Sequence, residues 1–174
     1  MKREIGLTLL ELIVSLAIIG IVLVVTVPGF SPWKSEKTFN NTYTMLQDEL
    51  NNLRSTAISM TTTTVMVVTQ TGTTYSLSGY NYSLVPPATT CPSATPGVGW
   101  TLLYTKTIPI ATNYQITGNI FPTNTCFFHD GSSSGSNFVV SQVPDTSCAA
   151  VTIPNSCATI SVTTASGYVD VEVN

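Results

Sequence analysis

The chain has 174 residues, which is enough for one modest domain beyond a hydrophobic N-terminal segment. Its formal net charge of −3 excludes the basic surface that marks a general nucleic-acid-binding protein. Few residues are charged, but the chain is rich in Val, Ile, Thr, Tyr and Phe, which is typical of a folded, strand-rich domain and not of a disordered segment.

The first predicted element is an apolar helix over Leu7–Val27. About twenty apolar residues span a bilayer, and Lys2 and Arg3 before the run favour a cytoplasmic N-terminus. A cleaved secretory signal has a shorter apolar core followed by an A-x-A site, which this run does not match. The sequence therefore predicts a single-pass membrane anchor, with the rest of the chain outside the cytoplasm.

One acidic residue, Glu11, lies inside this apolar run. An ionised carboxylate in hydrocarbon costs roughly 2.5–3.5 kcal/mol on insertion scales. Cleavage after Gly6 would create an α-amine on Leu7, four residues before Glu11, and positions i and i+4 share one face of a helix. The amine of the same chain or of a neighbour would then neutralise the carboxylate. We therefore expect Glu11 to set the register between assembled helices.

A second helix, amphipathic in pattern, is predicted in the segment 30–60. Pro28 and Pro32 predict a break or kink after the apolar run, so the helix is expected to begin with Ser35 as its N-cap and Glu36 in its first turn. Its apolar residues recur at intervals of three and four, and this stripe favours packing against a sheet over a short coiled coil. The stripe consists of Phe39, Tyr43, Leu46, Leu50, Leu53 and Ala57.

After Met60 the pattern becomes strand-like, and six to eight strands are expected in the segment 61–174. Strands are predicted at 61–70, 74–85, 100–110 and 114–121, a loop at 86–99, a hairpin over 125–142 around HDGSSSG, and a closing hairpin, ATISVTT and YVDVEV, around ASG. A long helix followed by an antiparallel sheet predicts an α+β fold.

Four cysteines, Cys91, Cys126, Cys148 and Cys157, lie in the C-terminal part of the chain. An even number downstream of an export signal indicates two disulfides in an oxidising compartment. No pair has the C-x-x-C spacing of a zinc ribbon or a thioredoxin-like site. Three pairings are possible. The short intervening loop favours Cys148–Cys157, which leaves Cys91–Cys126.

The single histidine, His129, is the one candidate for acid–base chemistry, and it lies beside Asp130 and several serines. A catalytic triad is defined by geometry and not by neighbourhood in sequence, and Asp130-Gly131 is a typical turn pair. We therefore interpret this segment as a hairpin turn and predict no catalytic residue. A calcium site needs several acids in one short loop, so no metal or cofactor is expected.

The N-terminal sequence GLTLLELIVSLAIIGIVLVVTVP resembles the class III signal of type IV pilins and type II secretion pseudopilins. The resemblance implies a leader, residues 1–6, that prepilin peptidase removes by cutting between Gly6 and Leu7. It implies N-methylation of Leu7, an assembly role for Glu11 and a helix-breaking role for Pro28. Leu7 stands where the family usually has phenylalanine.

The order of LxxLRSTAI, TVMVV, FFHDGSSSG and ISVTTASGYVDV resembles the GspH/FimT type of minor pilin. This resemblance implies the pilin fold, in which a transmembrane helix at 7–29 continues as the helix at 30–60 and packs on an antiparallel sheet domain at 61–174. The implied protein is a structural subunit that is incorporated in, or primes, a type IV pilus or type II secretion pseudopilus. Its implied partners are other pilin subunits, the inner membrane and prepilin peptidase, and the globular domain is expected to be periplasmic or extracellular.

Three alternatives stay open at this point. A major pilin would form the bulk of the fibre, and a membrane-anchored binding module or enzyme would need a polar cluster beyond His129 and Asp130. A DNA-uptake pilin of the FimT type would bind DNA through a basic C-terminal segment. Here the matching tail, GYVDVEVN, has two acids and no cation. Because phosphate contacts come mainly from Lys and Arg, no nucleic-acid partner is predicted.

Overall fold

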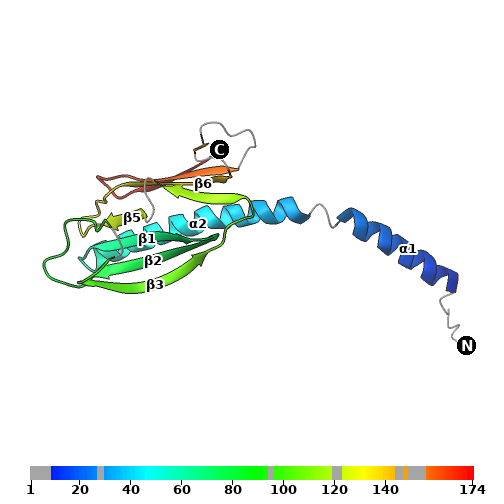
Figure 1. The fold of residues 1–174 in the computed structure, drawn as a ribbon, viewed down its shortest axis with the longest axis horizontal. Helices are drawn as coiled ribbons and strands as arrows, with labels where there is room; N and C mark the ends of the chain where they lie inside the picture. Colours follow the sequence, from blue (N-terminus) through cyan, green and yellow to red (C-terminus); the bar gives the residue numbers. More distant parts are fainter. Residues whose placement is uncertain (1–8, 27–29, 94–95, 119–122, 144–146, 149–155) are drawn as a thin grey trace, which may run out of the picture. The chain divides into compact units, whose positions relative to one another are not determined.

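The computed structural model describes residues 9–26, 30–93, 96–118, 123–143, 147–148 and 156–174, which fall into two compact units, Met1–Glu36 and Lys37–Asn174. The described elements are α1 (Leu9–Thr26), α2 (Phe30–Ser59), β1 (Thr64–Thr71), β2 (Thr74–Tyr82), β3 (Trp100–Ile108), β4 (Tyr114–Gly118), β5 (Thr123–Phe127), β6 (Ser136–Gln142), β7 (Cys157–Val162) and β8 (Val169–Val173). Figure 1 shows these elements in sequence colours.

The helix α1 occupies the apolar N-terminal run. Every large aliphatic side chain between Leu9 and Val22 is exposed. A helix that is apolar on all sides is suited to burial in an apolar environment. Within the described residues, no helix is both long and apolar enough to cross a membrane. The predicted span Leu7–Val27 includes residues 7, 8 and 27, which lie outside the described residues, as does the predicted kink at Pro28.

The helix α2 begins earlier than the sequence pattern predicts. It starts at Phe30, so the expected N-cap at Ser35 and the first-turn position of Glu36 are wrong. The reason is that Pro32 falls in the first turn of α2, where a proline removes no helical hydrogen bond. Pro32 is therefore compatible with the start of this helix and does not mark a break before it.

The strands form two four-stranded antiparallel sheets, with the orders β3-β2-β1-β5 and β4-β6-β7-β8. The expected α+β class is therefore confirmed, and two predicted hairpins are present. Strands β1 and β2 pair down to Thr71 and Thr74 at their turn, and β7 and β8 pair around the Ala165–Gly167 turn, with Val162 opposite Val169.

The predicted hairpin over 125–142 is wrong. Strand β5 pairs with β1, with Val65 opposite Cys126, whereas β6 pairs with β4 and β7 in the other sheet. Within the predicted hairpin, an isolated bridge pairs Phe127 with Ser133. Both Phe127 and Phe138 are fully buried in the shared core. The chain therefore crosses from one sheet to the other at this turn, and each arm contributes an aromatic ring to the shared core.

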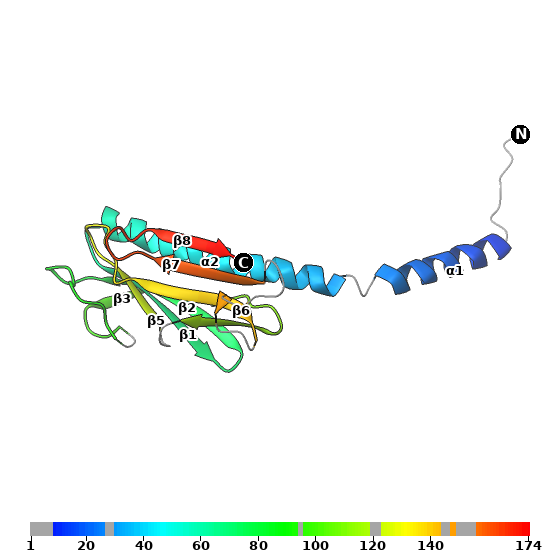
Figure 2. The same ribbon diagram turned by 90° about the horizontal axis from the view of Figure 1, so that it is seen from above.

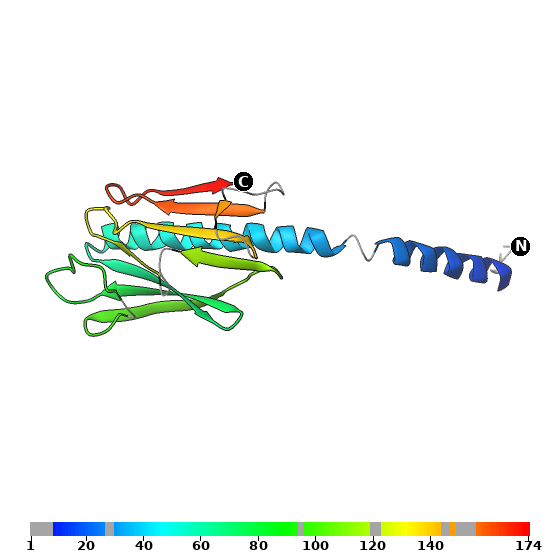
Figure 3. The same ribbon diagram turned by 45° about the horizontal axis from the view of Figure 1, so that its top comes forward.

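The core lies where α2 packs against both sheets. From Lys37 onward, α2 runs lengthwise between the β7–β8 strands, in orange and red, and the β1–β3 strands, in teal and green (Figure 3), and Figure 2 shows β7 and β8 beside it. The predicted apolar stripe faces this core: Phe39, Leu46, Leu50, Leu53 and Ala57 are buried, and Tyr43 is partly buried against them. The interpretation of the stripe as a sheet-packing face is therefore confirmed. A broad apolar stripe of this kind lets one helix bury its face against the core between two sheets.

Candidate assembly site

Of the residues predicted to act in processing and assembly, the structure describes one, Glu11. Glu11 is exposed in the first turn of α1, and its backbone carbonyl oxygen accepts a hydrogen bond of 2.7 Å from Ser15 Oγ. Gly6, Leu7 and Pro28 lie outside the described residues. That Leu7 and Glu11 share one helix face therefore stays a prediction.

In the globular unit, the LxxLRSTAI segment is the last part of α2. Leu50, Leu53 and Ala57 contribute buried side chains to the core. Arg54 points away from that stripe, and its Nε donates a 3.0 Å hydrogen bond to the carbonyl oxygen of Ser166 in the β7–β8 turn. The arginine therefore holds the C-terminal hairpin to the helix.

The FFHDGSSSG segment forms the turn between β5 and β6. Asp130 Oδ1 accepts hydrogen bonds from the backbone N–H of Ser132, at 2.9 Å, and from its hydroxyl, at 2.6 Å. These bonds, the side-chain bond first, lower the pKa of Asp130 below its ordinary value. His129 is exposed. Asp130 thus shapes the turn, as the turn interpretation predicts.

The serines of this turn also have structural partners. Ser133 donates through its N–H to the carbonyl of Thr164 and through its hydroxyl to the carbonyl of Thr163, each at 2.8 Å. Ser134 Oγ accepts from the backbone N–H of Cys126 at 3.0 Å. The Ser133 bonds tie the FFHDGSSSG turn to the ISVTTASGYVDV hairpin, and the Ser134 bond ties it to β5.

Gly167 is the point at which these segments meet most closely. It has a φ of +60°, and a Cβ there would lie 2.5 Å from the carbonyl oxygen of Gly131 and 3.2 Å from Nε of Arg54. A left-handed residue of this kind is normally glycine. Three of the four segments on which the GspH/FimT resemblance depends, LxxLRSTAI, FFHDGSSSG and ISVTTASGYVDV, are therefore in mutual contact.

An ion pair between a buried carboxylate and a half-exposed lysine joins α2 to β3, and the sequence pattern did not predict it. Glu49 is 7% exposed, and its Oε1 accepts a hydrogen bond from Nζ of Lys106. Lys106 also lies 5.0 Å from the ring centroid of Tyr104. The signal was available, because Lys106 is the one cation after Arg54 in the sequence and Glu49 interrupts the apolar side of α2.

The protonation of this cluster is set by opposing effects. Burial alone would raise the pKa of Glu49, but the hydrogen bond and charge of Lys106, together with the nearby Tyr104 hydroxyl, outweigh burial and lower it. Burial, followed by the neighbouring Glu49 carboxylate, raises the pKa of Tyr104. Among the described residues, Glu49 Oε2 and the Tyr104 hydroxyl make no hydrogen bond of standard geometry, so we attribute their mutual effect to proximity.

Two disulfides are present, and both agree with the pairing that the loop lengths favoured. Cys91–Cys126 joins the loop before β3 to β5, and Cys148–Cys157 closes a short loop before β7. Both belong to the globular unit, where cystines fit an oxidising compartment.

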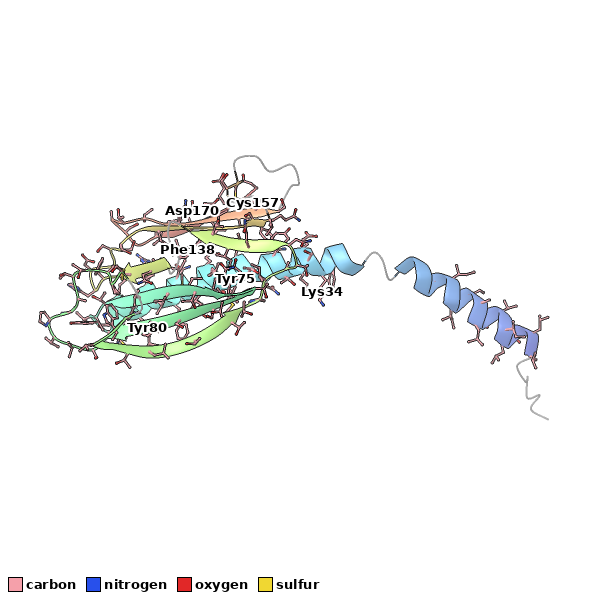
Figure 4. All side chains as sticks on the ribbon, in the orientation of Figure 1. Lys34, Tyr75, Tyr80, Phe138, Cys157 and Asp170 are labelled. Atoms are coloured by element: carbon pink, nitrogen blue, oxygen red, sulfur yellow. A yellow bond between two sulfur atoms is a disulfide. The ribbon has the colours of Figure 1, made fainter. Side chains whose placement is uncertain are left out.

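The C-terminal tail lies on an edge strand. In β8, Asp170 and Glu172 are exposed, and Figure 4 labels Asp170 on that sheet. Val169 and Val171 alternate with these acids and pack against the core. The outer face of this strand is therefore negatively charged, which opposes contact with a phosphate backbone.

Comparisons with known proteins agree with both parts of the chain. Residues 1–27 match the family model of the prokaryotic N-terminal methylation motif. No curated protein matches the sequence at a significant level. The fold is similar to that of a crystal structure of the type IV minor pilin FimU of Pseudomonas aeruginosa PAO1, with 13% identity, a TM-score of 0.51 and coverage of 80% of this chain and 88% of that chain. A second crystal form of FimU gives 14% identity, a TM-score of 0.49 and coverage of 76% and 91%.

Proposed function

We propose that this chain, which has a prokaryotic N-terminal methylation motif and a fold similar to that of a type IV minor pilin, acts as a structural subunit, of the minor-pilin type, of a type IV pilus or type II secretion pseudopilus. The observation that carries the proposal is the order of its parts. A methylation motif at residues 1–27 directly precedes a helix that continues into a domain with the fold of a solved minor pilin.

The first step is anchoring and processing in the inner membrane. The apolar run holds the precursor in the bilayer, with Lys2 and Arg3 on the cytoplasmic side and the globular unit outside the cytoplasm. Prepilin peptidase removes residues 1–6 by cutting between Gly6 and Leu7, and the new amine of Leu7 is N-methylated. The exposed aliphatic side chains of α1 support this proposal, because they need an apolar environment.

The second step is assembly through the N-terminal helices. Glu11 of an entering subunit meets the Leu7 amine of a neighbour, and the two charges neutralise each other in a medium that penalises either one alone. The contact is heterologous, since the carboxylate and the amine belong to different surfaces. Contacts of this kind build an open helical filament and not a closed ring. The globular unit then lies outside the helical bundle and supplies partner contacts.

The test removes the carboxylate alone. In cells that express the Glu11→Ala chain, the protein should still insert in the inner membrane but be lost from sheared filaments, which an immunoblot of both fractions would show. Glu36→Ala is the matched control, because Glu36 is an exposed acid outside the apolar run, and it should assemble normally. Wild-type incorporation of the Glu11→Ala chain would contradict the proposal.

A major pilin is the second candidate, because Cys148–Cys157 closes a loop near the C-terminus, and a disulfide-closed terminal region is common in major pilins. The fraction of this chain in purified fibres separates the two. The minor-pilin proposal expects it to be a small component beside another pilin. Fibres made mostly of this chain would establish the major-pilin role instead.

A further inference from the structure

A pocket of about 240 Å³ is lined by residues from the end of α2, the segment before β1, and the end of β2 with the loop that follows it. The lining includes Met60, Thr61, Asn81, Tyr82, Ser83 and Leu84. All of these residues belong to the globular unit. The pocket is smaller than the usual site for a drug-sized ligand, so it fits a group of the size of one sugar ring.

The chemistry of the lining is neutral. None of the lining residues carries a charge at neutral pH. The sequence has no Asp, Glu, Lys or Arg between Ser55 and Thr105. An ionic ligand would therefore find no counter-charge on the wall. Side-chain amide and hydroxyl groups alternate there with Met60, Leu84 and the ring of Tyr82. Such a wall matches a ligand with hydroxyl groups at its edge and C–H groups on its face.

The polar groups of the pocket are oriented by the protein. The Thr62 hydroxyl lies within hydrogen-bond distance of two acceptors, Asn81 Oδ1 at 2.8 Å and the carbonyl oxygen of Tyr82 at 2.6 Å, and its single hydrogen bonds one of them at a time. Because Asn81 accepts through Oδ1, that bond leaves its two Nδ2 hydrogens for another partner. Tyr82 also packs edge-on against Trp100, with 5.1 Å between ring centroids, so its ring is held in place.

The wall formed by residues 82–84 is built against Gly99. A Cβ at Gly99 would lie 2.7 Å from Cε2 of Tyr82 and 2.8 Å from Cδ1 of Leu84. Ser83 is tied to the same residue, since its N–H and its hydroxyl donate to the Gly99 carbonyl at 2.8 and 3.1 Å. Only a glycine leaves room for these side chains, and its φ of +88° also favours glycine.

The loop that carries this wall is held near its middle by a disulfide. It connects Tyr82 to Trp100 without a helix or strand in its described residues, and loops of such length are typically functional or disordered. Here Cys91 is bonded to Cys126 of β5, and Asn124 Nδ2 donates to the Pro92 carbonyl at 2.6 Å. The pocket is therefore preformed, which lowers the entropic cost of binding.

We propose that this pocket binds a single sugar ring of a neutral glycan, with Asn81 as hydrogen-bond donor and Tyr82 as the apolar wall. A neutral peptide is a less suitable ligand, since extended peptides are typically recognised along a strand edge, whereas this pocket is concave and uses side chains. The chain would thereby attach a filament, or its tip, to an uncharged polysaccharide surface.

The test is saturation-transfer NMR on the full-length protein in dodecylphosphocholine, a detergent without a sugar head group. The probes are methyl α-glucoside, methyl β-galactoside and N-acetylglucosamine, with N-acetylneuraminic acid and a blocked Ala-Ser-Ala peptide as comparisons. At least one neutral sugar should bind in the millimolar range and the comparisons should not. Binding of none of the three sugars, or stronger binding of the acidic sugar or the peptide, would overturn the proposal.

Variants assign the signal to the pocket. Asn81→Leu and Tyr82→Leu should each weaken binding of that sugar about tenfold, which corresponds to roughly 1.4 kcal/mol. The Asn81 change leaves Thr62 its bond to the Tyr82 carbonyl, so this variant is expected to fold even if the other does not. Asn137→Leu and Tyr168→Leu, both exposed in the other sheet region, are matched controls and should bind as the wild type does. Unchanged binding in a folded Asn81→Leu chain would also overturn the proposal.

Discussion

At the scale of residues, the Glu49–Lys106–Tyr104 cluster is the main electrostatic feature of the globular unit. Glu49 is nearly buried, and a buried carboxylate is tolerated only when it is paired and hydrogen-bonded. Lys106 supplies the charge and Tyr104 the neighbouring hydroxyl. The cluster therefore links α2 to β3 in a way that depends on the ionisation of Glu49.

The first prediction concerns pH. The pKa of Glu49 is lowered in the folded state from its ordinary value of 4.5, so its contribution to stability is present above that value and is lost as the pH falls through the folded pKa. The free energy of unfolding of the wild type, measured by denaturant titration, should therefore decline below about pH 4.5. Glu49→Gln should lower stability at pH 7 and flatten this decline.

The exposed acid Glu36 provides the control for that measurement. Glu36→Gln should leave both the stability at pH 7 and its decline in acid close to wild type. Equal pH profiles for wild type and Glu49→Gln would show that the ion pair contributes nothing to acid stability.

The second prediction compares two glycines of nearly equal φ. Gly72 has a φ of +62° with nothing within 4 Å of an added Cβ, whereas Gly167 has a φ of +60° and the Gly131 carbonyl at 2.5 Å. Gly72→Ala should lower the free energy of unfolding by about 1–2 kcal/mol, the usual cost of the left-handed conformation for a residue with a Cβ. Gly167→Ala should cost more, because it also separates the two turns and displaces Arg54. If thermal or denaturant unfolding shows equal losses of stability in the two variants, the packing around Gly167 does not contribute to stability.

At the scale of elements, the two disulfides constrain loops of different length. Cys91 and Cys126 are separated by 35 residues, and Cys148 and Cys157 by 9. In the chain-entropy account a longer loop gives more stabilisation, about 4 kcal/mol for the first and about 2.5 kcal/mol for the second. Replacing Cys91 and Cys126 by alanine should therefore lower the free energy of unfolding more than replacing Cys148 and Cys157. The opposite order would mean that the short loop holds structure beyond its closure entropy.

Sequence patterns predicted the elements whose determinants are local. The stripe on α2 was evident because Phe39, Leu46 and Leu53 share one helix face, and the β7–β8 hairpin was evident because its turn is short and contains Gly167. Loop length likewise favoured the Cys148–Cys157 pairing that the structure contains.

Patterns failed where a partner is distant in the chain. Strand β5 pairs with β1, and no local signal at Thr125–Phe127 distinguishes this from pairing with β6. The start of α2 was misjudged because a proline is unfavourable inside a helix but acceptable in its first turn. The glycan pocket was not foreseen either, because Asn81, Tyr82 and Gly99 meet only through the fold of the loop before β3.

At the scale of the whole molecule, the chain has an N-terminal unit with the helix that carries Glu11, the proposed assembly residue, and a globular unit with its own core. The globular unit presents an acidic edge strand and a neutral pocket. In the proposed filament, Glu11 sets the axial register, and the globular unit supplies the contacts with partners.

The proposal depends most directly on the chemistry of the mature N-terminus, because an amine four residues before Glu11 exists only after cleavage. Mass spectrometry of the N-terminal peptide from protein in sheared filaments measures this. The account predicts a chain that begins at Leu7 and carries one added methyl group. Filament protein that begins at Met1, with residues 1–6 still attached, would contradict it.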